Sequence, residues 1–203
     1  GVANDRAGTP NVASAVLNFQ VDTIPPRIES VVRKTPAGIS TGATSVSFEV
    51  TFSEAMSEPV RPTRFQAVMG GDVTSASVTG VSGGGAVWTV FVNTGTGEGS
   101  LGILYFTDDP VETHSLKDLA GNPLTNSTPQ GANESYMIDR SAPTPVITLA
   151  AGQAKRTKVS PVRFQVAFDE DIPLFTGNDI DFTGRTVGGT LSATVTGGLS
   201  VYQ

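Results

Sequence analysis

Acidic residues recur at two places in this 203-residue sequence in a pattern that suits metal binding. The first set comprises Asp22, Glu54, Asp118 and one of Asp108 or Asp109. The second set comprises Asp139, Asp169, Glu170 and Asp171. Carboxylates held close together repel one another, and a hard cation with oxygen ligands relieves that repulsion. One interpretation of this pattern is Ca²⁺ bound at both sets. The alternative is that these residues cap turns and remain in water, as aspartate does in a turn such as Asp-Leu-Ala-Gly-Asn.

The other reactive residues do not form a catalytic pattern. His114 is the only histidine, with Ser115 and Asp109 nearby in the same loop. A Ser-His-Asp triad requires an oriented geometry, which adjacency in one loop does not supply. Trp88 and Tyr105 lie in strongly apolar stretches, so core packing is favoured over a sugar-binding platform. We therefore expect a protein that is not an enzyme.

Two copies of one motif show where the chain divides. Val21-Asp22-Thr23-Ile24-Pro25-Pro26 returns as Ile138-Asp139-Arg140-Ser141-Ala142-Pro143, and the two aspartates are 117 positions apart (139 − 22). That length suits one sandwich domain and is too long for a solenoid repeat. The motif predicts the last strand of a preceding repeat over 1–23, a complete repeat over 24–140 and the N-terminal part of a following repeat over 141–203.

The elements between the two motifs are predicted to be strands. The clearest pattern alternates Val46, Phe48, Val50 and Phe52 with polar residues, as a half-buried strand does. The expected strands lie near 27–33, 45–53, 63–69, 73–81, 86–94, 100–107 and 133–139. Seven short strands in about 115 residues predict an all-β, immunoglobulin-like Greek-key β-sandwich, repeated in tandem. Further strands are expected at 13–21 and from Asn178-Asp179-Ile180-Asp181 onward.

This architecture predicts where the first acidic set lies. Strands of a sandwich alternate in direction, so the loops after the second and sixth strands share an end with the linker that enters the first strand. Asp22, Glu54 and Asp118 should therefore converge there. The repeat from 141 stops at the start of its fifth strand, so we expect its missing strands to come from a continuing chain or from another chain.

Composition excludes several classes of partner. The chain has 13 Lys and Arg against 19 Asp and Glu, a formal charge of −6. This balance argues against nucleic acid and anionic membrane surfaces, which bind basic faces. No apolar run approaches the ~20 residues needed to span a bilayer, so membrane insertion of this segment is not expected. The sequence contains no cysteine, which excludes disulfides, thiol nucleophiles and cysteine-based zinc sites.

Three short motifs resemble the bacterial immunoglobulin-like (Big-type) tandem repeats of large surface proteins and adhesins. They are the two joints, the stretches FEVTFSEAM (48–56) and FQVAFDEDI (164–172), and DLAGNP (118–123). The resemblance implies an extracellular stalk or spacer at the bacterial cell surface, often rigidified by calcium at the joints, whose partners are neighbouring repeats or other copies of itself. Arg140 departs from the pattern, because the family has a small residue there.

Two alternatives to a stalk remain open from the sequence. One is a carbohydrate-binding module that recognises a glycan at a loop end. The other is a filament subunit assembled by strand exchange, in which the strand near 13–21, or one from another chain, fills the open sandwich of 141–203.

Overall fold

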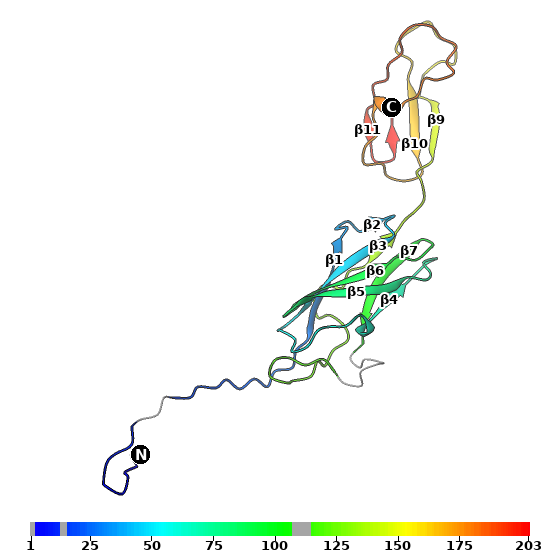
Figure 1. The fold of residues 1–203 in the computed structure, drawn as a ribbon. Helices are drawn as coiled ribbons and strands as arrows, with labels where there is room; N and C mark the ends of the chain where they lie inside the picture. Colours follow the sequence, from blue (N-terminus) through cyan, green and yellow to red (C-terminus); the bar gives the residue numbers. More distant parts are fainter. Residues whose placement is uncertain (1–2, 13–15, 107–114) are drawn as a thin grey trace. The chain divides into compact units, whose positions relative to one another are not determined.

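The computed structural model describes residues 3–12, 16–106 and 115–203. The chain divides into two compact units, Gly1–Arg140 and Ser141–Gln203 (Figure 1). The described residues form strands, turns and two short 3-10 helices, η1 (Pro62–Arg64) and η2 (Gly177–Asp179). Neither of these helices has the length or apolar character of a membrane span.

The first sheet of the first unit has the order β1-β3-β6-β5 and is antiparallel throughout. Its strands are β1 (Ile28–Thr35), β3 (Ser45–Phe52), β6 (Val87–Asn93) and β5 (Ser77–Gly84). The central strand β3 carries the clearest alternation in the sequence, and its side chains Val46, Phe48, Val50 and Phe52 are all buried. The period-2 pattern therefore correctly predicted the inner face of this strand.

The second sheet has the order β2-β8-β7-β4. Its strands are β2 (Ser40–Thr41), β8 (Tyr136–Ile138), β7 (Gly99–Tyr105) and β4 (Phe65–Met69), and only β2 runs parallel to its neighbour. The two sheet orders are those of a constant-type immunoglobulin domain, with the two-residue β2 added beside the last strand. The predicted all-β sandwich is confirmed. The short β2 was not predicted.

Aromatic side chains from both sheets meet in the core of the first unit. Phe48 lies edge-on to Tyr136, with ring centroids 5.1 Å apart, and Tyr105 contacts Phe65 at 5.5 Å in the same geometry. Trp88 is also buried, and its indole N–H donates to the Gly85 carbonyl at 3.0 Å. Burial of a large apolar side chain stabilises a fold by roughly 1.5–3 kcal/mol. Trp88 and Tyr105 are core residues, as predicted.

The outer edge of β1 is covered by residues 126–134. The Val31 N–H donates to the Ala132 carbonyl at 2.7 Å, and the Glu134 N–H donates to the Val31 carbonyl at 2.9 Å. The side chain of Asn126 accepts a bond from the Ile28 N–H at 2.9 Å. This part of the long loop before β8 satisfies backbone groups that an exposed edge would leave unpaired.

The second unit contains one four-stranded sheet, of order β11-β12-β10-β9. Its strands are β9 (Pro145–Leu149), β10 (Phe164–Phe168), β11 (Gly197–Gly198) and β12 (Val201–Tyr202). The register repeats that of the first sheet of the first unit: Val166 pairs with Tyr202 as Val50 pairs with Trp88. The turn repeats as well, with φ of 58° at Leu199 and 59° at Gly85.

One predicted strand is not formed in the described residues, and another is wrong. The described residues 16–21 are extended and exposed but belong to no strand, because a strand needs a neighbour for its backbone groups and no described segment lies beside them. Residues 177–179 form η2 instead of opening a strand. There the Thr176 N–H and hydroxyl donate to the Asp179 carboxylate at 2.8 and 2.9 Å, which caps the helix locally.

Candidate functional site

Three acidic side chains of the predicted first set meet at one end of the first sandwich. Carboxylate oxygens of Asp22, Glu54 and Asp118 all lie within 4.8 Å of one another. Asp22 belongs to the segment that enters β1, Glu54 follows β3, and Asp118 lies in the connection between β7 and β8. Strand alternation in the sandwich brings these three segments to the same end, as the sequence predicted.

The turn that follows Asp118 holds its carboxylate from both sides. One oxygen accepts the backbone N–H of Asn122 and the other accepts the Asn122 side-chain N–H, each at 2.8 Å. The side chain of Asp118 is buried. Beside it, the Ser57 N–H donates to the Lys117 carbonyl at 2.8 Å, and Met56 forms an antiparallel bridge with Asp118. These backbone contacts place the Glu54 loop next to the Asp118 turn.

Asn122 also connects this turn to the segment that enters the first strand. Its side-chain amide donates to the Asp22 carbonyl at 3.2 Å, while the Asp22 carboxylate accepts the Ile24 N–H at 3.0 Å. The residues predicted from the sequence were all carboxylates, and Asn122 was not among them. Its position at the end of Asp-Leu-Ala-Gly-Asn was the available signal, since asparagine and aspartate commonly bond turn backbone.

The three carboxylates have unequal electrostatic environments. The pKa of Glu54 is raised, first by burial and then by the charges of Asp118 and Asp22, with Arg27 acting in the opposite direction. Burial also acts to raise the pKa of Asp118. That effect is outweighed by bonds from the Asn122 side chain and from backbone N–H groups of the turn, so the pKa is lowered. Asp118 is therefore ionised at neutral pH, whereas burial and the charges of Asp118 and Asp22 oppose ionisation of Glu54.

The donor set fits a hard divalent cation. Ca²⁺ binds six to eight oxygen ligands from carboxylates, carbonyls and water. Three carboxylates from three segments would supply part of that shell, and backbone carbonyls and water would supply the rest. The group also contains no histidine or cysteine, whose nitrogen or sulfur favours transition metals.

None of the other predicted ligands that the structure describes joins this group. Asp108, Asp109 and His114 lie outside the described residues. Asp139 belongs to the first unit, whereas Asp169 and Glu170 belong to the second. Within either unit, the described residues form no second group of three acids close enough to share an ion.

Asp169 instead fastens the entry of the second unit. It accepts the Thr144 N–H at 2.7 Å, and this bond is the main cause of its lowered pKa. The equivalent bond in the first unit runs from the Arg27 N–H to the Ser53 hydroxyl at 3.0 Å. A side chain after the second strand thus binds the start of the first strand in both units.

Arg140 binds the turn between β6 and β7. Its guanidinium donates to the Thr94 hydroxyl at 2.8 Å and to the carbonyls of Gly95 and Gly97. Its backbone N–H donates to the Glu98 carboxylate at 3.1 Å. A small residue could make only the last of these bonds, so Arg140 adds a fixed contact at the end of β8.

Comparison with known proteins places the chain in no described family. No family model matches the sequence, and no curated protein matches it. Among solved structures, the chain is similar to the N-terminal part of the bacterial S-layer protein SbsC, with 19% identity and a TM-score of 0.36. The match covers 71% of this chain and 40% of that structure, and a likeness this distant supports no functional argument. The fold itself defines the class, an all-β protein of immunoglobulin-like sandwich architecture with an acidic cluster where the first strand enters.

Proposed function

We propose that this chain is a non-catalytic structural segment of a bacterial extracellular protein, in which sandwich repeats act as a stalk or spacer at the cell surface. One observation carries the proposal: both units build the same sheet in the same register. A stalk needs a repeated unit and a defined joint, and each unit here follows the same Asp-containing, proline-containing motif. The Pro25-Pro26 pair restricts the backbone at the first joint.

The proposed location is tested on cells of the source organism. An antibody against this segment should label intact cells, and brief protease treatment of intact cells should remove the labelled material. Labelling only after the cells are opened would contradict a surface location.

The carbohydrate-binding alternative gains no support, because Trp88 and Tyr105 are both core residues. The strand-exchange alternative gains none from the described residues 16–21, which pair with no strand.

The finer part of the proposal is that Ca²⁺ binds Asp22, Glu54 and Asp118. Bound Ca²⁺ would remove the repulsion among the three carboxylates and fasten the segment before β1 to the end of the sandwich. That segment is also held by the Asn122 bond to the Asp22 carbonyl and by the Arg27 N–H bond to the Ser53 hydroxyl. The joint would then bend less, which is the property that a spacer requires.

Thermal unfolding of the full chain tests the calcium site. Trp88 is the only tryptophan and lies in the core of the first unit, so its fluorescence reports that unit alone. With a dissociation constant of about 10⁻⁴ M, 10 mM Ca²⁺ should stabilise the unit by about 2.7 kcal/mol, or roughly 10 °C in Tm, relative to chelator. An unchanged Tm would rule out the calcium site. The proposal of a surface stalk would then be tested by the labelling experiment alone.

Two substitutions separate a metal site from a structural cluster. Asp22→Asn keeps an oxygen for the Ile24 N–H and should abolish the calcium-dependent rise. Glu54→Gln removes the repelling charge, so it should raise the Tm slightly in chelator and lower it relative to wild type in calcium. Asp5→Asn, at an exposed position outside the cluster, should leave both values unchanged. The same sign of effect for Glu54→Gln in both conditions would contradict the site.

A further inference from the structure

The edges of the first sandwich are protected unequally. The β1 edge is covered by residues 126–134, β2 contains only two residues, and β5 carries a register irregularity between Val78 and Gly80. The strand β4 has none of these features. Its sequence Phe-Gln-Ala-Val-Met contains no charge, proline or bulge, which are the usual defences of an exposed edge. In the described part of the chain, β4 pairs with β7 on one side and with no strand on the other.

The phase of the β4–β7 ladder shows which backbone groups face outward. Gly70 and Ser100 exchange both backbone bonds, at 2.9 and 3.1 Å. Antiparallel ladders alternate, so Gln66 and Val68 also bond toward β7, while Ala67 and Met69 direct their N–H and C=O groups to the open side. Phe65 directs its carbonyl outward, and its N–H is already bonded to the Pro62 carbonyl.

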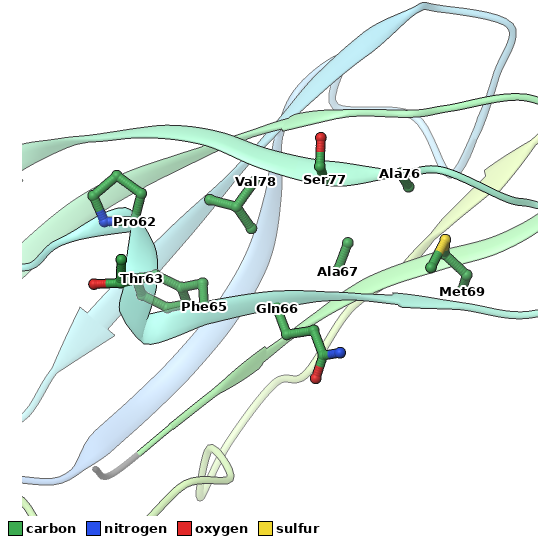
Figure 2. A pocket seen from close by; sticks show the side chains of 9 residues that line it. All are labelled: Pro62, Thr63, Phe65, Gln66, Ala67, Met69, Ala76, Ser77 and Val78. Carbon is green, nitrogen blue, oxygen red and sulfur yellow. The ribbon is translucent and has the colours of Figure 1, made fainter. Parts of the chain in front are cut away.

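A groove of about 360 Å³ runs along this edge, between β4 and the edge of β5 in the opposite sheet. Figure 2 shows Ala67 and Met69 pointing toward β5, while Gln66 points to the other side. The β5 wall is formed by Ala76, Ser77 and Val78. The groove therefore presents outward backbone groups beside a mainly apolar trough, which are the two requirements for an added strand.

We propose that β4 pairs antiparallel with β4 of a second copy of this chain, about a two-fold axis at Ala67. In this register Phe65 lies opposite Met69 of the second copy, Gln66 lies opposite Val68, and Ala67 lies opposite itself. The outward groups of the two Ala67 residues bond to each other, and each Met69 N–H reaches the Phe65 carbonyl of the other copy. The two sheets join into one continuous sheet.

The residues of this edge are complementary to themselves, and this identifies a second copy as the occupant. Val68 is 49% exposed and Met69 is 43% exposed, so pairing removes apolar surface from water. No charge within β4 meets its own copy. At the ends of the strand, exposed Arg61 precedes β4 and exposed Asp72 follows it. Antiparallel pairing brings Arg61 of each copy to Asp72 of the other, which is favourable at both ends.

Cysteine cross-linking of the full chain tests the register directly, because the chain has no native cysteine. Gln66→Cys and Val68→Cys, made in separate preparations and then mixed, place sulfurs in a closely spaced pair with Cα atoms ~4.5 Å apart, within disulfide reach. The mixture should cross-link roughly tenfold faster than either variant alone. Ser82→Cys, exposed on the β5 edge, should cross-link no faster than random collision. Equal rates in all samples would overturn the proposal.

Charge reversals and a proline substitution test the same interface without new sulfurs. Arg61→Asp and Asp72→Arg should each weaken the dimer in sedimentation equilibrium, and the double variant should restore it. Ala67→Pro removes an outward N–H that the monomer does not use, and it should abolish the dimer while the Trp88 unfolding transition remains. If Ala67→Pro still dimerises, or if the charge reversals leave the dimer affinity unchanged, the proposed pairing is wrong and the contact lies on another surface.

Discussion

At the scale of single residues, the acidic cluster depends on a neutral side chain. Asn122 donates to the Asp118 carboxylate and to the Asp22 carbonyl, and so links two segments that are 100 residues apart in sequence. The same bonds keep Asp118 ionised although it is buried. Asn122 therefore determines both the geometry of the cluster and its charge, although it is not an acid itself.

Substitution of Asn122 by alanine should give a pH-dependent loss of stability. The pKa of Asp118 is lower in the folded than in the unfolded chain, so its stabilisation is present above the unfolded value of about 3.9 and is lost as the pH falls through the folded value. In chelator, Asn122→Ala should lower the Tm by a few degrees at pH 7. The difference from wild type should narrow as the pH falls from 7 toward 3, because the Asp118 carboxylate progressively takes up protons and the Asn122 bond to its charged form is lost.

The matched control for this prediction is Asn126→Ala. Asn126 accepts the Ile28 N–H and donates to backbone carbonyls, and none of its bonds involves a carboxylate. Its loss should cost the same stability at both pH values. Trp88 fluorescence melts at pH 7 and pH 3 provide all of the measurements. If the Tm difference between Asn122→Ala and wild type stays constant with pH, the bond from the Asn122 side chain does not lower the pKa of Asp118.

At the scale of elements, the hairpin between β5 and β6 is copied in the second unit by β11 and β12. Gly83 pairs with Trp88 and Gly197 pairs with Tyr202, and both glycines have positive φ, 144° and 123°. A Cβ atom on Gly83 would lie 2.5 Å from the Val87 carbonyl oxygen, and one on Gly197 would lie 2.5 Å from the Val201 carbonyl oxygen. Backbone atoms cannot move aside easily, so this hairpin requires glycine.

Gly83→Ala should therefore destabilise the first unit by about 1–3 kcal/mol, through the clash and the strained φ. Its neighbour supplies the control, because a Cβ on Gly84 meets no atom within 4 Å. Gly84→Ala should change the free energy of unfolding by less than about 0.5 kcal/mol. Urea titrations followed by Trp88 fluorescence measure both values. Equal effects of the two substitutions would show that the hairpin relaxes around the added methyl group.

At the scale of the whole chain, the two units differ in how completely their sheets are covered. In the first unit, β3 and β6 pack against a second sheet, and Val50 and Val90 are fully buried. In the second unit the described strands form one sheet, and apolar residues such as Ile147 and Phe164 are 63% and 48% exposed. A sheet that buries less apolar surface opens at a lower free energy.

Hydrogen exchange of the full chain should reflect this difference. Amides of β10 should exchange at least about tenfold faster than those of β3, although the two strands have matching sequences and registers. Mass spectrometry of peptides that cover 45–52 and 164–168 measures both rates. The control is to repeat the measurement on diluted protein. Association between copies would slow the exchange of β10 amides only at high protein concentration. Equal protection at low concentration would contradict a difference in coverage.

Local patterns determined most of the first unit. The alternation of Val46, Phe48, Val50 and Phe52 predicted the central strand because a side-chain period of two has one structural solution when one face is buried. The repeated joint motif and the strand order placed Asp22, Glu54 and Asp118 at one end. These inferences required only residue types, spacing and the known geometry of a sandwich.

Contacts between distant segments decided the rest. Residues 16–21 alternate as a strand does, yet they form none in the described chain, because alternation describes a face and only a neighbour supplies the backbone bonds. The Asn122 links, the Arg140 contacts and the open edge of β4 depend on which segments lie beside them. The sequence by itself thus determined the longer strands of the first unit and the place where the carboxylates gather. The tertiary structure alone decided which side chains hold them there and which sheet edge stays unpaired, because hydrogen bonds between segments far apart in sequence have no local signature.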